Sequence, residues 1–300
     1  MASASAGNLL PRSRPRELED PLNFFVYHPL AARLARLLAP TGISPNAVSV
    51  MSLAALCAAT WAFITIAWPL NALTGLLFML IWHVVDGADG DLARMTGRAS
   101  ATGELVDGVC DYLGNVIMYF AFAFLLDDTL GALAWVLAVG AGASHIIQTN
   151  HAETQRRLYL WRAYGVPWLR NAAASGDDLF SRKGWFSRFF GFWAVGYVWL
   201  SERMSPSANP IDAALAKAAG DPRETQRVRA MVRRASRTSI VLQKGLGANP
   251  KTFIIAAAIA LGSPVYYFLA TLIGLNLLLA ISIVHHNRVD RRLAAALNRA

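Results

Sequence analysis

Six apolar segments dominate this chain, and they restrict its possible folds more than any other feature. They run over residues 47–67, 72–85, 105–126, 131–147, 252–261 and 265–284. Inside a bilayer every backbone polar group must be paired within its own segment, so apolar stretches of about 20 residues are expected to cross as helices. A charged fraction of 16%, against roughly 25% in soluble domains, agrees with lipid as the solvent for much of the surface. The sequence therefore predicts an all-α fold, a bundle of six transmembrane helices.

Positive charge predicts the orientation of this bundle. The connections near residues 68–70, 127–130 and 262–264 contain none of the 28 Lys and Arg, all of which fall on the opposite side. Cytoplasmic loops of membrane proteins carry the excess of Lys and Arg. We therefore expect both termini, and the acidic end of the second and third helices, to be cytoplasmic.

The chain is expected to have four parts. Residues 22–40, which include Arg33 and Arg36 among apolar positions, predict an N-terminal interfacial amphipathic helix. The expected boundaries are 1–21 for a disordered tail, 22–152 for the interfacial helix and transmembrane helices one to four, 153–250 for a cytoplasmic insertion, and 251–300 for helices five and six with a C-terminal tail. The fifth helix is too short to cross a bilayer comfortably unless it begins before residue 252.

The insertion is strongly basic, with 16 Lys and Arg against 7 Asp and Glu. Residues 224–244 within it have the pattern of a basic amphipathic helix, whose apolar side carries Val228, Met231, Val232 and Ala235. We expect this helix to lie on anionic membrane lipid, with a pocket for a negatively charged substrate as the alternative; nucleic acid is not expected. The aromatic run 185–200 has too short an uninterrupted part to cross, and is expected to be interfacial or re-entrant.

An acidic stretch at the second and third helices indicates chemistry. Residues 86–111 contain six carboxylates between two apolar runs. If the second helix continues through residue 97, Asp86 and Asp89 share a face, and if the third begins near Thr102, so do Asp107 and Asp111. Four like charges cannot share a low-dielectric site unless cations neutralise them. Oxygen ligands of this kind predict divalent Mg²⁺ or Mn²⁺.

Small residues and one arginine lie beside the acidic positions. Gly90, Ala93 and Gly97 form a smooth stripe where a ligand can approach the backbone, and Arg94 is placed to meet a phosphate. Asp91 points away from the shared face and is left out of the metal set. This combination is typical of metal-assisted diphosphate chemistry. A calcium-binding loop and solvated loop charges are the alternatives.

The pattern Asp86-x-x-Asp89-Gly90-x-x-Ala93-Arg94, then eight residues, then Gly103-x-x-x-Asp107-x-x-x-Asp111 resembles the signature of the CDP-alcohol phosphatidyltransferase family. The stretch SPNAVSV at 44–50 is similar to the Pro-Asn element of that family. One position departs from the eukaryotic choline and ethanolamine phosphotransferases: Gly108 stands where those enzymes have a histidine proposed as base.

The resemblance implies a six-helix membrane enzyme, usually a homodimer, with two divalent ions. By position, Asp86 and Asp107 would bridge both ions, Asp89 would hold one, and Asp111 would hold the other and serve as general base. The implied contacts to the CDP group are Asn46, Gly90, Ala93, Arg94 and Ser100. The implied location is a bacterial inner membrane, with the active site on the cytoplasmic side.

Two directions of transfer fit the motif. The first moves a phosphatidyl group from CDP-diacylglycerol to the hydroxyl of a small polar alcohol and releases CMP; the second uses a CDP-alcohol and a diacylglycerol-like acceptor. We favour the first, in membrane phospholipid synthesis, and the basic surplus favours a phosphorylated alcohol. Candidates for the acceptor pocket are His145, Gln148, His151, Arg156 and Arg157.

More remote alternatives are a prenyltransferase of the UbiA type and a cation transporter. The UbiA type has two acidic motifs far apart in sequence, whereas here the nearest aspartates of the two pairs, Asp89 and Asp107, are close. A transporter would place its carboxylates near the middle of a span and would have no use for Arg94. Neither alternative fits the stretch as well as diphosphate chemistry does.

Overall fold

The computed structural model describes residues 15–166, 196, 199–206 and 209–298. These residues are 86% helical and contain no strand, so the all-α prediction is confirmed. They divide into two compact units. The motif unit consists of Asp20–Ile146 and Ala248–Leu275, and the basic unit consists of the described residues within Met1–Glu19, Ile147–Gly247 and Asn276–Ala300. The aromatic run 185–200 lies mostly outside the described residues.

Within the described part of the chain, five helical segments are long and apolar enough to cross a bilayer. They are α2 (Pro45–Thr65), α3 (Leu70–Met95), Val106–Leu130 of α4 (Ala101–Leu130), α5 (Ala132–Tyr164), and the continuous run Val265–Leu297, which comprises α12 (Val265–Leu269), η5 (Ala270–Leu275) and α13 (Asn276–Leu297). Together with the sequence, they describe an integral membrane protein.

The fifth apolar segment of the sequence forms α11 (Ala248–Ala260), which begins earlier than expected. Its 13 residues span about 20 Å at 1.5 Å per residue, whereas the hydrocarbon core is about 30 Å thick. At this length α11 alone is shorter than the hydrocarbon core, and it would cross only where the bilayer thins or flanking residues extend the span, so five segments rather than six are long enough by themselves. The N-terminal region is helical in η2 (Asn23–Tyr27), α1 (His28–Leu38) and η3 (Ala39–Thr41).

Local signals set where the helices of the motif begin. Ser44 caps α2 by accepting a hydrogen bond from the Ala47 N–H, and Pro45 occupies the first turn. Ser100 caps α4 in the same way, by accepting from the Gly103 N–H. Between α3 and α4, Gly97 has a φ of 65°, which favours glycine. The chain therefore reverses in a few residues and places α4 directly after α3.

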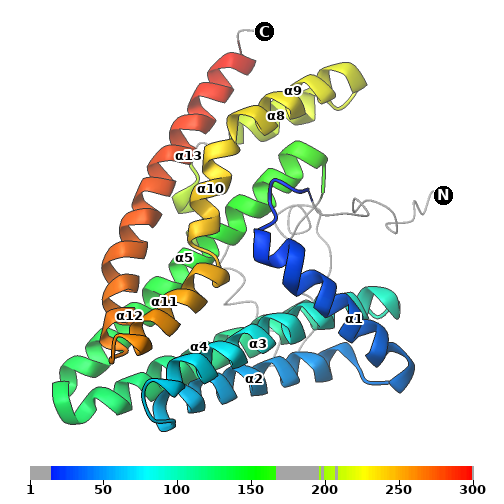
Figure 1. Ribbon diagram of the computed structural model, residues 1–300. Coiled ribbons are helices and arrows are strands. Elements are labelled where there is room, and N and C mark those ends of the chain that lie inside the picture. The colour runs from blue at the N-terminus through cyan, green and yellow to red at the C-terminus, as the bar shows by residue number, and fades with distance from the viewer. Residues whose placement is uncertain (1–14, 167–195, 197–198, 207–208, 299–300) are drawn as a thin grey trace, which may run out of the picture. The chain divides into compact units, whose positions relative to one another are not determined.

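Close helix packing holds the motif unit together. Helices α2, α3 and α4 run side by side in Figure 1, and α1 packs on α3. A Cβ at Gly75 would lie 2.1 Å from the Phe63 ring, so glycine is required where α3 crosses α2. A Cβ at Gly87 would lie 3.3 Å from the Ala31 Cβ, so this motif residue lets α1 approach α3.

The basic unit is built from the part of α5 that begins at Ile147, from α13 and from three shorter helices, which are α8 (Asn209–Ala218), α9 (Pro222–Ala235) and α10 (Arg237–Gly245). Figure 1 shows α8 and α9 side by side. The single basic amphipathic helix expected over residues 224–244 is divided at Ser236 into α9 and α10, and α9 carries the expected apolar side. Its Val228 and Val232 are buried, and Val232 belongs to a core with Tyr159, Ile211 and Leu293. The apolar side of α9 therefore packs on protein, and these two valines do not face lipid.

Two arginines of α9 meet the C-terminal end of α5. The Arg233 guanidinium donates a hydrogen bond to the Ala163 carbonyl at 3.1 Å. Gly165, with a φ of 76°, closes α5, and a Cβ there would lie 2.4 Å from the Arg229 guanidinium. Cations at a helix C-terminus are favourable because its carbonyls carry partial negative charge. These arginines consequently stabilise the unit, although Arg233 is itself exposed, as are Arg227 and Arg234.

A buried ion-pair network joins three helices of the basic unit. Arg162 of α5 is 5% exposed and donates hydrogen bonds to Asp212 of α8 at 3.1 Å and to Asp290 of α13 at 3.1 Å. Removing one member of such a network leaves a buried charge uncompensated, which is strongly destabilising. The network therefore fixes how α8 and α13 pack on α5.

Part of the expected tail is attached to the basic unit. The Glu17 carboxylate accepts hydrogen bonds from the Tyr159 and Tyr164 hydroxyls, and Leu18 packs on the core of this unit. Partial burial alone would raise the pKa of Glu17, but these hydrogen bonds and nearby Arg233 lower the pKa below its ordinary value. Glu17 is therefore a charged anchor for the start of the described chain.

Candidate metal centre

Two adjacent helices carry the acidic residues. Asp86 and Asp89 lie one turn apart on α3, and Asp107 and Asp111 lie one turn apart near the start of α4. The helical spacing assumed from the sequence is present, because α3 continues to Met95 and α4 begins at Ala101. Each helix therefore presents two carboxylates on one face.

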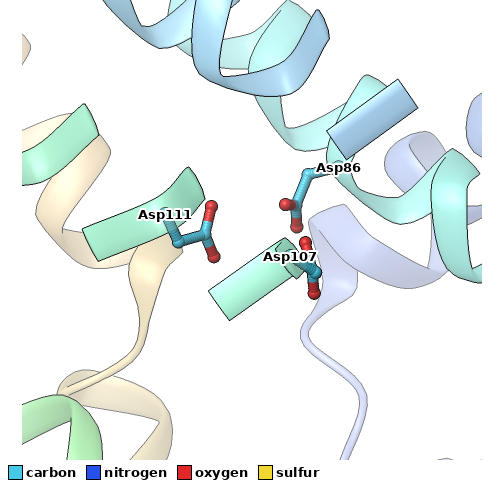
Figure 2. A group of neighbouring side chains, drawn as sticks. All are labelled: Asp86, Asp107 and Asp111. Carbon is cyan, nitrogen blue, oxygen red and sulfur yellow. The ribbon is translucent and has the colours of Figure 1, made fainter. Parts of the chain in front are cut away.

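Three of these carboxylates converge. One oxygen each from Asp86, Asp107 and Asp111 lie within 4.8 Å of one another. Figure 2 shows the three side chains facing a common space from the two helices. Among the described residues, these three form the group of Asp, Glu, His or Cys side chains whose ligand atoms lie close enough together to hold a metal ion.

The chemistry of the three carboxylates fits a divalent cation. Each has its Oδ1 atom buried without a hydrogen-bond partner in the described structure. Buried carboxylate oxygens are costly unless a donor or a cation compensates them. Oxygen-only ligands suit the hard ions Mg²⁺ and Mn²⁺ rather than softer metals. The acidic group can therefore bind a metal ion.

Asp89 is arranged differently from the other three. It is 7% exposed, and its Oδ2 atom accepts a hydrogen bond from the Ser49 hydroxyl of α2. Its carboxylate also neighbours that of Asp107. Asp89 thus lies at the edge of the acidic group, between α2 and the three converging carboxylates.

The residues implied as CDP contacts lie on α2, on α3 and at the start of α4. Arg94 forms an ion pair with Asp91 at 2.5 Å, and its side chain is half exposed. A Cβ at Gly90 would lie 3.3 Å from the Arg94 guanidinium, so Arg94 covers that glycine. Asp91, which was left out of the metal set in the sequence prediction, is therefore the ion-pair partner of Arg94.

The remaining implied contacts are Asn46, Ala93 and Ser100. Asn46 and Ser100 are exposed at the starts of α2 and α4, and Ala93 is half-buried on α3. A Cβ at Gly103 would lie 3.3 Å from the Ser100 hydroxyl and 3.6 Å from the Asn46 side-chain oxygen, so both polar groups lie close to this glycine of the motif.

Sequence reasoning missed two neighbours of the acidic group. Ser49 follows Asn46 by three residues and shares its face of α2, so the helical spacing within SPNAVSV was a usable signal. Trp82 precedes Asp86 by four residues on α3, is buried, and lies beside the Asp111 carboxylate. An indole in an apolar helix gives no such signal, because its contact with α4 depends on tertiary packing.

The acceptor candidates are each engaged with other residues of the protein. His145 accepts from or donates to the Tyr119 hydroxyl at 3.1 Å through its Nδ1 atom, in the motif unit. In the basic unit, Gln148 donates to Asn276 at 2.9 Å, and the His151 Nε2 atom is 2.9 Å from the Ser282 hydroxyl. Arg156 and Arg157 both bind Glu153. Roles in binding an acceptor stay a prediction.

Comparison with known families adds a finding to this geometry. Residues 42–171 match the family model described as CDP-alcohol phosphatidyltransferase. This match covers α2, α3 and α4 with the four aspartates of the motif, Asp86, Asp89, Asp107 and Asp111, and it confirms the resemblance drawn from the motif. No curated protein matches the chain.

Proposed function

Because residues 42–171 match the CDP-alcohol phosphatidyltransferase family, a class of transferases, we propose that this chain moves a phosphatidyl group from CDP-diacylglycerol to the hydroxyl of a small polar alcohol. The observation that carries the proposal is the convergence of Asp86, Asp107 and Asp111 within the matched segment. The product lipid and CMP would leave, which places the protein in phospholipid synthesis.

Individual residues of the chain have different roles in this reaction. Asp111 accepts the proton of the acceptor hydroxyl while that oxygen attacks the phosphorus distal to cytidine. The bond between this phosphorus and the oxygen bridging the two phosphates breaks, and that oxygen leaves as part of CMP. Trp82, which is buried beside Asp111, would restrict the Asp111 side chain and exclude water from that side of the carboxylate.

Asp86, Asp89, Asp107 and Asp111 would hold two ions, Mg²⁺ or Mn²⁺. Asp86 and Asp107 would contribute to both ions, as the family pattern implies. When bound, such ions neutralise the charge of the phosphates and polarise their oxygens. The buried, unpaired oxygens of three of these residues support this assignment.

Contacts to the CDP group are proposed for the residues around the Gly90 stripe. Arg94 would contact a phosphate, which requires it to share or exchange its ion pair with Asp91. Gly90 and Ala93 would let the ligand approach α3. Asn46 and Ser100, exposed near Gly103, would contribute polar contacts.

The second direction of transfer, from a CDP-alcohol to a diacylglycerol-like acceptor, uses the same motif and stays the alternative. Gly108, where the eukaryotic enzymes of that type have a histidine, favours the first direction. The basic surplus of the insertion favours a phosphorylated alcohol, for which His145, Gln148, His151, Arg156 and Arg157 are proposed contacts.

The topology is proposed to have six crossings, with α11 as the fifth and α1 as an interfacial helix. Both termini, the active site and the insertion at 153–250 would face the cytoplasm, in a bacterial inner membrane, and the enzyme would be a homodimer. The expected parts remain 1–21, 22–152, 153–250 and 251–300. The exposed arginines of α9 would contact anionic lipid.

Cysteine labelling tests this topology. A label at Asp128 is expected to react only from outside the cell, because the loop there belongs to the side without Lys or Arg. Labels at Arg170 and Arg234 are expected to react only from the cytoplasm. Reaction of residue 234 from outside would contradict the six-helix arrangement and indicate an additional crossing at 185–200.

The activity is tested with purified protein, CDP-diacylglycerol and a panel of polar alcohols that includes phosphorylated ones. CMP release is measured with Mg²⁺, with Mn²⁺ and with a chelator. We expect release that requires both a divalent ion and one of the alcohols. Release only from a CDP-alcohol with diacylglycerol would establish the alternative direction, and no release from either pair would contradict the proposal.

A further inference from the structure

A buried hydroxyl of the first transmembrane helix contacts the acidic group. Ser49 is 2% exposed on α2, and its Oγ lies 2.5 Å from the Asp89 Oδ2 atom on α3. The same Oγ lies 3.4 Å from the Pro45 carbonyl. A serine hydroxyl has one proton, and the shorter contact to an ionised acceptor is the stronger one. Ser49 therefore donates its proton to Asp89.

The position of Ser49 is itself well defined. Ser44 and Pro45 fix the start of α2, one turn before Ser49. A donor on a rigid helix can hold its acceptor in one orientation, whereas a donor on a loop holds it less well.

The hydrogen bond occupies one of the two oxygens of Asp89. The other oxygen is left for the acidic group, because the Asp89 carboxylate neighbours that of Asp107. Of the four aspartates of the motif, Asp89 is the one that does not belong to the converging group. Hydrogen-bond partners orient carboxylates that ligate metals, and loss of such a partner typically weakens metal binding.

We propose that Ser49 is a positioning residue that orients Asp89 for metal binding. This inference rests on the proposed function, because it takes Asp89 as a metal ligand. It assigns a role in the metal site to the first transmembrane helix, which supplies no carboxylate to it. The same face of α2 carries Asn46, a proposed CDP contact, so α2 would link the metal side of the site to the nucleotide side.

The test measures Mn²⁺ binding directly, by the loss of the free Mn²⁺ electron paramagnetic resonance signal in the absence of substrates. Ser49→Ala is expected to weaken binding by about tenfold or more, which is the usual scale for losing a group that orients a metal ligand. Ser52→Ala is the matched control, because Ser52 is equally buried on the same helix but donates to the backbone. It is expected to bind Mn²⁺ as the wild type does.

Ser49→Thr and Ser49→Val form a second matched pair, equal in shape and different in the hydroxyl. Threonine is expected to bind Mn²⁺ more tightly than valine, whatever the added methyl group does to folding. This pair keeps the inference testable if the alanine variant does not fold. Equal binding by the threonine and valine variants would overturn the role of the hydroxyl.

A double-mutant comparison separates positioning from general stability. In an Asp89→Asn background, Ser49→Ala is expected to cause little further loss of Mn²⁺ binding, because the carboxylate that Ser49 orients is gone. Losses that multiply in the double variant would contradict the inference. Wild-type protein that does not bind Mn²⁺ would instead contradict the proposed metal site, whereas weakened binding in Asp89→Asn with unchanged binding in Ser49→Ala would contradict only the role of Ser49.

Discussion

Asp111→Asn is expected to lower the rate of CMP release by about two orders of magnitude or more, on the scale of losing a general base. Asparagine keeps the shape of the side chain and one ligand oxygen, but it cannot accept the proton of the acceptor hydroxyl. Binding of the CDP donor in the presence of Mg²⁺ should largely survive. The measurements are single-turnover CMP release and equilibrium binding of CDP-diacylglycerol in detergent.

Asp91→Asn is the control for this variant. Asp91 lies in the same acidic stretch but pairs with Arg94 and does not belong to the converging group. An exposed ion pair of this kind contributes little energy, so turnover should stay within a few-fold of wild type. An inactive Asp91→Asn protein together with an active Asp111→Asn protein would show that the helical-face assignment is wrong.

Asp86→Asn is expected to abolish activity by a different route. Asp86 is one of the three converging carboxylates, and it is proposed to contribute to both ions. Without its charge, Mn²⁺ binding and metal-dependent donor binding should be lost together. Calorimetric titration with Mn²⁺ and then with donor checks both steps.

The pattern across the two variants is the discriminating result. Asp111→Asn should separate turnover from donor binding, whereas Asp86→Asn should remove both. If Asp86→Asn bound donor as wild type does and lost only turnover, the division between metal ligand and base proposed for these aspartates would be wrong.

Much of the metal centre follows from local sequence. The spacing of Asp86 and Asp89, and of Asp107 and Asp111, places each pair on one face of a helix. Ser100 caps α4 and Gly97 has a positive φ, so the short reversal between the two helices also depends on local residues. Helical periodicity and short loops are local properties, so the convergence of two helices could be predicted without tertiary information.

The fold class also follows from the sequence, because apolar segments in a bilayer have few alternatives to helices. The length of each segment does not follow as directly. The expected fifth segment forms α11, whose 13 residues stop short of a bilayer's thickness. The sixth continues without interruption to Leu297. Helix ends that depend on packing and on flanking polar residues are not encoded by hydropathy alone.

Tertiary structure alone decided which partners the polar side chains have. The Ser49 hydroxyl reaches Asp89 across two helices, and Arg162 joins Asp212 and Asp290 from distant parts of the chain. The valines of α9 pack on protein, although their pattern fits a membrane surface equally well. An amphipathic pattern predicts that a helix has an apolar side, and only the packed structure shows what covers that side. The sequence by itself therefore determined the helical segments, the shared faces of the acidic pairs and the resemblance to a family over residues 42–171, whereas long-range packing decided how each face is used.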